Sequence, residues 1–100
     1  MSVTIGAKEI PAWTIQQVHL DDQRVLIEAW AREDLEREAI RNACGNLSEG
    51  DIVLLEAKDS YSDRRVSGRR RIAWVHLKES VESGRSKLVL QMALHKVAGD

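Results

Sequence analysis

An arginine-dense segment in the second half of the chain contains the residue types best suited to binding an anion. Five arginines fall within eight positions, with no acidic residue among them: Arg64, Arg65, Arg69, Arg70 and Arg71. A guanidinium group binds phosphate through two parallel hydrogen bonds and stacks on bases. Tyr61 could add a stacking platform, and Lys78, Arg85 and Lys87 could extend the positive surface. The segment therefore predicts a nucleic-acid-binding loop whose affinity rests on phosphate contacts.

The same arginines have two other interpretations. They could bind an acidic protein partner. They could also form a solvated loop that discourages edge-to-edge strand pairing, or pair with acidic residues of the predicted helix, such as Asp34, Glu36 and Glu38. Residues 1–50 carry five Lys/Arg against nine Asp/Glu, and residues 51–100 carry ten against seven. The net charge of −1 and the pI near 6.3 do not indicate a dedicated DNA binder.

The other reactive residue types do not form a catalytic or metal-binding pattern. His19, His76 and His95 are far apart in the sequence, and they share no spacing with the single cysteine, Cys44. Cys44 lies at the C-terminal end of a predicted helix, where a buried apolar role is expected and a reactive thiolate is not. The six glycines are scattered, so no phosphate-binding loop is indicated. We predict no catalytic residue, no metal and no cofactor.

Composition predicts one globular domain that spans residues 1–100. The chain is 43% hydrophobic and 31% charged, which is ordinary for a folded domain. Its apolar runs are far shorter than the roughly 20 residues that cross a bilayer, and no secretory leader is evident. A cytoplasmic protein without a membrane partner is expected. Trp74 is expected in the core, and Trp13, near the N-terminus, is expected to be partly exposed.

The first half predicts a hairpin followed by a helix. Residues 1–10 could fray or form a short edge strand. Segments 12–20 and 24–31 alternate as strands, and a phase slip between Gln16 and Gln17 indicates a bulge. The alternative is one long helix over 22–43. Residues 32–44 repeat apolar positions at helical spacing and end at Gly45.

The second half predicts three strands, over 51–57, 70–78 and 86–97. The continuous apolar run in 52–55 suggests a strand covered on both faces, and 58–69 and 79–85 are expected to be polar loops. The resulting order is β-β-α-β-β-β. We therefore expect an α+β fold, a small curled antiparallel sheet or partly open barrel of about five strands with one principal helix.

Two stretches of the second half resemble a known family. Residues 46–56 place Gly50 and Asp51 before a strand, and Gly68 leads residues 67–75 into an apolar strand. This arrangement resembles the PUA-related ASCH domains over residues 46–97. The resemblance implies a small β-barrel that handles RNA or modified nucleosides. The Gly-Lys-Lys/Arg-Thr segment of that family has no counterpart in this chain, so the resemblance does not extend to amidohydrolase activity.

Three functions follow from these observations. The leading expectation is a non-enzymatic module that binds RNA or single-stranded nucleic acid through the arginine-rich loop. The alternative is a protein-interaction module, such as a small subunit, an inhibitor or a phage-type accessory protein, and it could be oligomeric. A small nucleoside hydrolase is third, on the family resemblance alone.

Overall fold

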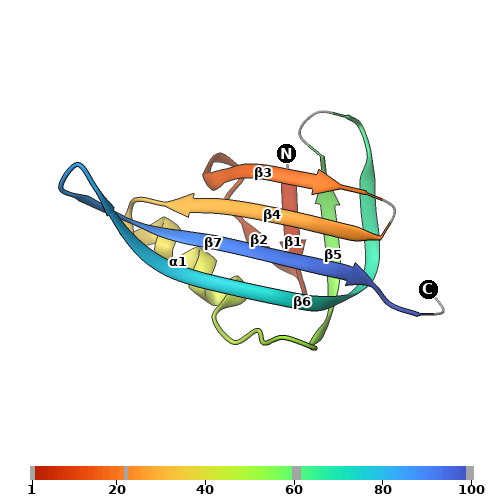
Figure 1. Ribbon diagram of the computed structural model, residues 1–100. Helices are drawn as coiled ribbons and strands as arrows, with labels where there is room; N and C mark the ends of the chain where they lie inside the picture. The colour runs from red at the N-terminus through yellow and green to blue at the C-terminus, as the bar shows by residue number, and fades with distance from the viewer. Residues whose placement is uncertain (1, 22, 60–61, 99–100) are drawn as a thin grey trace.

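The computed structural model describes residues 2–21, 23–59 and 62–98 (Figure 1). Seven strands and one α-helix follow one another in the order β-β-β-β-α-β-β-β, with a short 3-10 helix at Ala12–Thr14 before the third strand. The elements are β1 (Ser2–Ile5), β2 (Lys8–Ile10), β3 (Ile15–Leu20), β4 (Arg24–Ala31), α1 (Asp34–Cys44), β5 (Ile52–Lys58), β6 (Arg65–Glu82) and β7 (Arg85–Lys96). No helix within the described ranges has the length and apolar character needed to cross a membrane.

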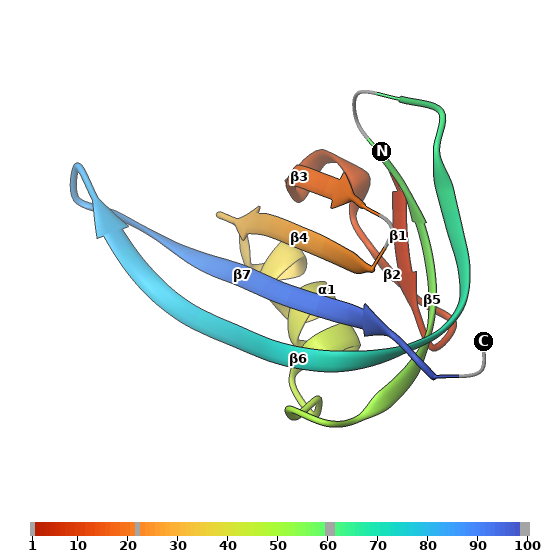
Figure 2. The same ribbon diagram turned by 45° about the vertical axis from the view of Figure 1, so that its right-hand side comes forward.

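All seven strands belong to one antiparallel sheet in the order β2-β1-β5-β6-β7-β4-β3. The long strand β6 joins its two halves. Residues 65–71 of β6 pair with β5, and residues 70–82 pair with β7. Figure 2 shows β6 curving between these partners, so β1, β2 and β5 run steeply across β3, β4 and β7. The sheet curls around one core without closing, and its edges are β2 and β3.

The expected fold of about five strands is wrong. Strand makes up 62% of the structure, and the sheet has seven strands. The error has two sources. Residues 2–10 form the β1–β2 hairpin, with Gly6 and Ala7 at positive φ in its turn, where fraying or a single edge strand was expected. Residues 65–69, expected to lie in the polar loop 58–69, form the first part of β6.

The core lies on the concave face of the sheet, and the alternation of the strands explains its composition. In β4, Val25, Ile27, Ala29 and Ala31 point inward, because successive strand residues face opposite sides. The predicted inward face of β7 is confirmed, and its members are buried: Leu88, Leu90, Met92 and Leu94. Helix α1 packs beside β2 and β4 and buries its apolar stripe: Ile40, Ala43 and Cys44.

The predicted hairpin in residues 12–31 is confirmed in the form of β3 and β4. Val18 pairs with Ile27, and the register shifts between Ile15 and Gln17, next to the predicted bulge. The alternative of one long helix over 22–43 is therefore excluded. Helix α1 begins after a capping box, in which Glu33 and Glu36 accept backbone N–H groups reciprocally.

Strands β6 and β7 extend beyond the rest of the sheet as a two-stranded arm, residues 80–87 (Figure 1). Its tip is a two-residue turn in which Ser83 (φ 54°) and Gly84 (φ 77°) both have positive φ. Such turns match the twist of the flanking strands, which allows pairing to continue to the tip. The polar loop expected at 79–85 is therefore mostly strand.

Candidate functional site

The exposed face of β6 carries a continuous run of cationic and aromatic side chains, here called the β6 stripe. Its members alternate with inward-facing residues along the strand: Arg65, Ser67, Arg69, Arg71, Trp74, His76 and Lys78. All seven side chains are exposed, and none is acidic. A single strand therefore presents four cations and two aromatic rings on one face of the sheet.

A β-bulge keeps the arginines and the aromatic residues on the same face. Simple alternation after Arg71 would point Ala73 outward and Trp74 inward. The register instead shifts between Ile72 and Trp74, so Ile72 pairs with Leu94 and Trp74 pairs with the adjacent Ala93. The extra residue turns Trp74 to the outside, where it is 39% exposed. The prediction of a core Trp74 is therefore wrong.

The two aromatic rings of the stripe are neighbours. The ring centroids of Trp74 and His76 lie 5.2 Å apart, with an interplanar angle of 36°. Aromatic rings on a convex sheet surface can stack on nucleobases, because every base has a π face. The cations on either side of the pair, Arg71 and Lys78, are each within a few residues along β6.

Strand β5 borders the arginine part of the stripe and adds apolar surface to it. Arg71 pairs with Ile52, and Arg69 pairs with Leu54. These aliphatic side chains are 45% and 62% exposed, so the prediction that both faces of this strand are covered is wrong. The nearest carboxylate along β5 is that of Glu56, which is opposite Ser67. The face is therefore basic with an apolar border.

The five predicted arginines do not share one face of the sheet. Arg65, Arg69 and Arg71 share the exposed face, whereas Arg70 has the opposite orientation and is half-buried opposite Val53 and Lys96. One buried Nη1 atom of Arg70 has no hydrogen-bond partner within the described ranges. Arg64 is exposed just before β6, and its carbonyl oxygen accepts the backbone N–H of Asp59 at 3.0 Å.

The remaining predicted residues fall in three places. Tyr61 lies outside the described residues. Lys78 belongs to the β6 stripe. Arg85 and Lys87 lie on β7 in the arm, beside a groove, so they do not extend the arginine surface directly.

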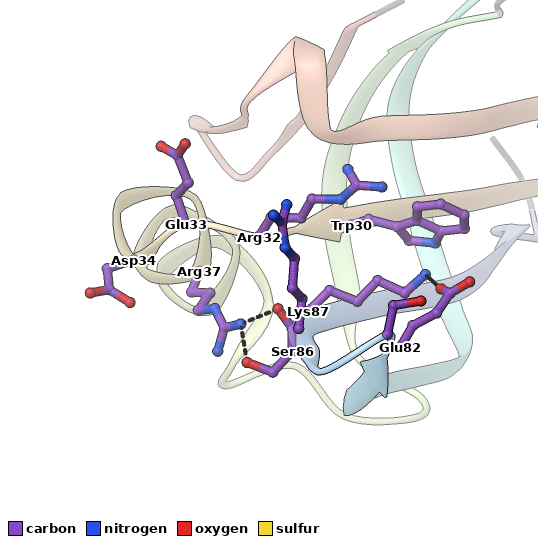
Figure 3. A pocket seen from close by; sticks show the side chains of 10 residues that line it. Trp30, Arg32, Glu33, Asp34, Arg37, Glu82, Ser86 and Lys87 are labelled. Atoms are coloured by element: carbon purple, nitrogen blue, oxygen red, sulfur yellow. Dashed lines mark hydrogen bonds and ion pairs between the residues drawn. The ribbon is translucent and has the colours of Figure 1, made fainter.

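This groove, here called the arm groove, lies between the arm, the end of β4 and the start of α1 (Figure 3). It has a volume of about 840 Å³. Trp30 is on one side, where the Nζ atom of Lys87 is 3.6 Å from its ring centroid and the guanidinium carbon of Arg32 is 5.3 Å away. The cations of the groove are accompanied by three carboxylates: Glu33, Asp34 and Glu82.

Two of the cations of the arm groove, Arg37 and Lys87, have partners within the protein. Arg37 donates to both Glu79 oxygens, at 3.0 and 3.2 Å, and to the Ser86 carbonyl and hydroxyl oxygens. Lys87 pairs with Glu82 at 3.1 Å. The capping box occupies the backbone N–H groups of Glu33 and Glu36 at the start of α1. The groove therefore fastens the arm to the helix.

One acidic residue of α1, Glu36, also has local partners. Glu36 accepts the backbone N–H groups of Arg32 and Glu33 and the indole N–H of Trp13. Burial acts to raise the pKa of Glu36, but these hydrogen bonds outweigh it and hold the pKa below its ordinary value. Among the described residues, the ion pairs of α1 join Arg37 and Arg41 to Glu79, and no acid of the helix pairs with an arginine of β6. The predicted exposure of Trp13 is confirmed at 75%.

The residues that could carry covalent or metal chemistry are not assembled into a site. Burial raises the pKa of the Cys44 thiol to about 12, so this cysteine is not a thiolate at neutral pH. Within the described ranges, no three His, Cys, Asp or Glu side chains lie close enough to hold a metal ion.

The sequence prediction missed four side chains of this face: Trp74, His76, Ile52 and Leu54. Alternation from Arg65 to Arg71 was visible in the sequence, but the bulge that continues the stripe to Trp74 carries no glycine or other clear signal. Comparisons with known proteins find no matching family model, curated protein or solved structure. The resemblance to ASCH domains stays a prediction, and a function has to be argued from the chemistry of the surface.

Proposed function

We propose that this protein binds single-stranded nucleic acid along the β6 stripe. The observation that supports this function best is the shared exposed face of β6, where Arg65, Arg69, Arg71 and Lys78 flank the ring pair of Trp74 and His76. Cations that contact phosphates and rings that stack on bases are the two components of sequence-tolerant binding to single strands. The stripe offers both without a carboxylate among its members.

The spacing within the stripe suits an extended strand. Side chains on one face of a β-strand recur about every 6.6 Å, since each residue rises about 3.3 Å. Arg69 and Arg71 are therefore one such step apart, and Trp74 follows across the bulge. A nucleic-acid strand lying along β6 would place phosphates on the arginines and bases on the aromatic pair. A duplex is less suitable, because its bases are stacked inside and unavailable to Trp74.

The net charge of −1 does not oppose this function. Phosphate binding depends on the local density of cations and not on the sum over the chain. Glu36 of α1 has partners at the start of the helix, and the acids of the arm groove neighbour the cations of that groove. The basic surface and the main acidic surface therefore belong to different elements.

A titration of labelled single-stranded RNA and DNA at two salt concentrations tests the proposal. The stripe variant is Arg69→Ala/Arg71→Ala. The matched control is Arg32→Ala/Arg85→Ala, which removes two arginines from the arm groove. For single strands, losing two phosphate contacts should reduce the slope of log affinity against log salt by about 1.4. Equal binding by the wild type and the stripe variant would refute the proposal.

A second function is favoured by one specific observation. Ile52 and Leu54 are exposed beside the arginines, and exposed aliphatic groups next to guanidinium groups suit an acidic protein surface better than a phosphate chain. A Leu54→Ser variant separates the two functions. It should leave the affinity for oligonucleotides unchanged, and it should weaken a protein complex if the chain is an interaction module.

A further inference from the structure

A small hollow lies on the outer face of the sheet directly beside the aromatic pair of the stripe. It has a volume of about 200 Å³, and Trp74 forms one wall while Leu26 forms part of the opposite one. Ala93 lies between these two residues in the register of β4, β7 and β6, and it is 1% exposed. A short side chain between two larger ones leaves a shallow depression. Its walls are apolar, and one of them is the exposed indole ring of Trp74.

The rim of this hollow is polar and rich in acceptors. It contains Gln17, Glu28 and Gln91, which follow one another across β3, β4 and β7. The Nε2 atom of Gln91 donates to Oε1 of Glu28 at 2.9 Å. This bond uses one N–H group of the Gln91 side chain. It leaves Oε2 of Glu28 and Oε1 of Gln91 as acceptors without a hydrogen-bond partner among the described residues.

We infer that the hollow receives a single nucleobase stacked against Trp74 and selects bases that carry an exocyclic amino group. This inference rests on the proposed function, because the base must belong to a strand bound along β6. A carboxylate and an amide oxygen accept hydrogen bonds from amino groups, as acidic side chains do from N4 of cytosine. Cytosine, adenine and guanine each present such a group.

Uracil and thymine fit the same rim poorly. Each presents a carbonyl oxygen where cytosine presents its amino group. That oxygen would face the acceptor of Glu28 or Gln91, and two acceptors cannot form a hydrogen bond with each other. The charge of Glu28 also keeps a phosphate out of the hollow. The phosphates are therefore directed to the arginines of the stripe, and a base is directed to the hollow.

The test compares the affinity of the full chain for cytosine, adenine and thymine homopolymers in single-stranded form. The wild type should bind the cytosine and adenine strands roughly tenfold more tightly than the thymine strand, a discrimination typical of one good base contact. Glu28→Gln removes the charge and one acceptor, so this preference should fall to about twofold or less. Gln17→Ala should reduce it to a smaller extent.

The matched control is Glu56→Gln, which removes an exposed carboxylate on β5 opposite the stripe and outside the hollow. It should keep the full preference. Equal affinity of the wild type for all three homopolymers would overturn this inference and leave the proposed function intact. Absence of binding to any of them would overturn both. A preference that Glu28→Gln and Glu56→Gln reduce equally would also overturn the inference, because it would be a general charge effect.

Discussion

Two regions of this molecule combine tryptophan with several cations, and they differ in what surrounds those cations. In the arm groove, Trp30 lies beside Lys87 and Arg32, and three carboxylates line the same space. In the β6 stripe, Trp74 lies between Arg71 and Lys78, and no member of the stripe is acidic. The first arrangement holds parts of the protein together. The second is the surface for which we propose binding to nucleic acid.

The difference shows that a count of cations and aromatic residues does not identify a binding surface. The groove is larger than the hollow beside Trp74, at about 840 Å³ against about 200 Å³. Two of the cations of the groove nevertheless have partners within the protein. Arg37 donates to Glu79 and Ser86, and Lys87 forms an ion pair with Glu82. A surface that is already neutralised gains little from an external anion.

The largest effect is expected on the free energy of unfolding, when the contacts of Arg37 in the arm groove are removed. Arg37→Ala removes charge-assisted hydrogen bonds from a guanidinium group that is only 17% exposed, and it leaves Glu79 with Arg41 alone. We expect the free energy of unfolding to fall by about 2 kcal/mol, measured by urea denaturation. Binding of single strands should be unchanged at temperatures where the variant is folded. Arg85→Ala, in the same groove, should change stability by less than about 0.5 kcal/mol. An Arg37→Ala variant of wild-type stability would show that the groove does not fasten the arm.

The two tryptophans offer the sharpest contrast in binding. Trp74→Ala should weaken single-strand affinity by about tenfold, which corresponds to about 1.4 kcal/mol and lies within the range for one base stacked on an aromatic ring. Trp30→Ala removes a ring that is covered by Lys87, so it should leave that affinity unchanged. Fluorescence anisotropy with a labelled strand measures both. A greater loss of affinity for the Trp30 variant would assign binding to the groove.

The backbone of the stripe depends on Gly68, which has a φ of +143° opposite the buried Leu55. Other residues rarely adopt this conformation. Gly68→Ala should therefore lower the free energy of unfolding by about 1 kcal/mol, although no atom would clash with the added methyl group. Ser67→Ala, at the neighbouring position, should be nearly neutral. Thermal unfolding of the two variants decides whether backbone strain has this effect.

The smallest expected effect is on the pH dependence of the free energy of unfolding, through Glu36 of α1. The pKa of Glu36 is lower in the folded protein than its ordinary value of 4.5. Its contribution to stability is therefore complete above that value and is lost as the pH falls through the lower pKa of the folded state. Glu36→Gln should flatten the pH dependence of stability in that acidic window. An unchanged profile would show that the hydrogen bonds from Arg32, Glu33 and Trp13 do not act on the charged form.

Local patterns of the sequence predict much of the fold but little of its surface. Alternation correctly predicted the buried face of β7, and the helical repeat correctly predicted α1, because both signals lie within one element. The strand number was wrong. The short strands β1 and β2 depend on pairing with each other and with β5. The long β6 depends on two different partners, β5 and β7, which no local pattern reveals.

The candidate site illustrates the same limit. The sequence identified the arginines, and their alternation was visible in it, but residues 58–69 were expected to be a loop, so the shared exposed face of Arg65, Arg69 and Arg71 was not predicted. It also could not place Trp74 outside, because the bulge before it depends on the register with β7. The hollow beside Trp74 combines residues from four strands, so no sequence spacing could have predicted it.

The indole N–H signals of Trp13, Trp30 and Trp74 give the most direct test of the account. The three tryptophans lie before β3, in the arm groove and in the β6 stripe, respectively. A ¹H–¹⁵N spectrum recorded during titration with a single-stranded oligonucleotide reports on all three at once. Binding along the stripe predicts that the Trp74 signal moves with saturation while those of Trp13 and Trp30 stay in place. Movement of the Trp30 signal alone, or of none of the three, would contradict the assignment of the stripe as the binding surface.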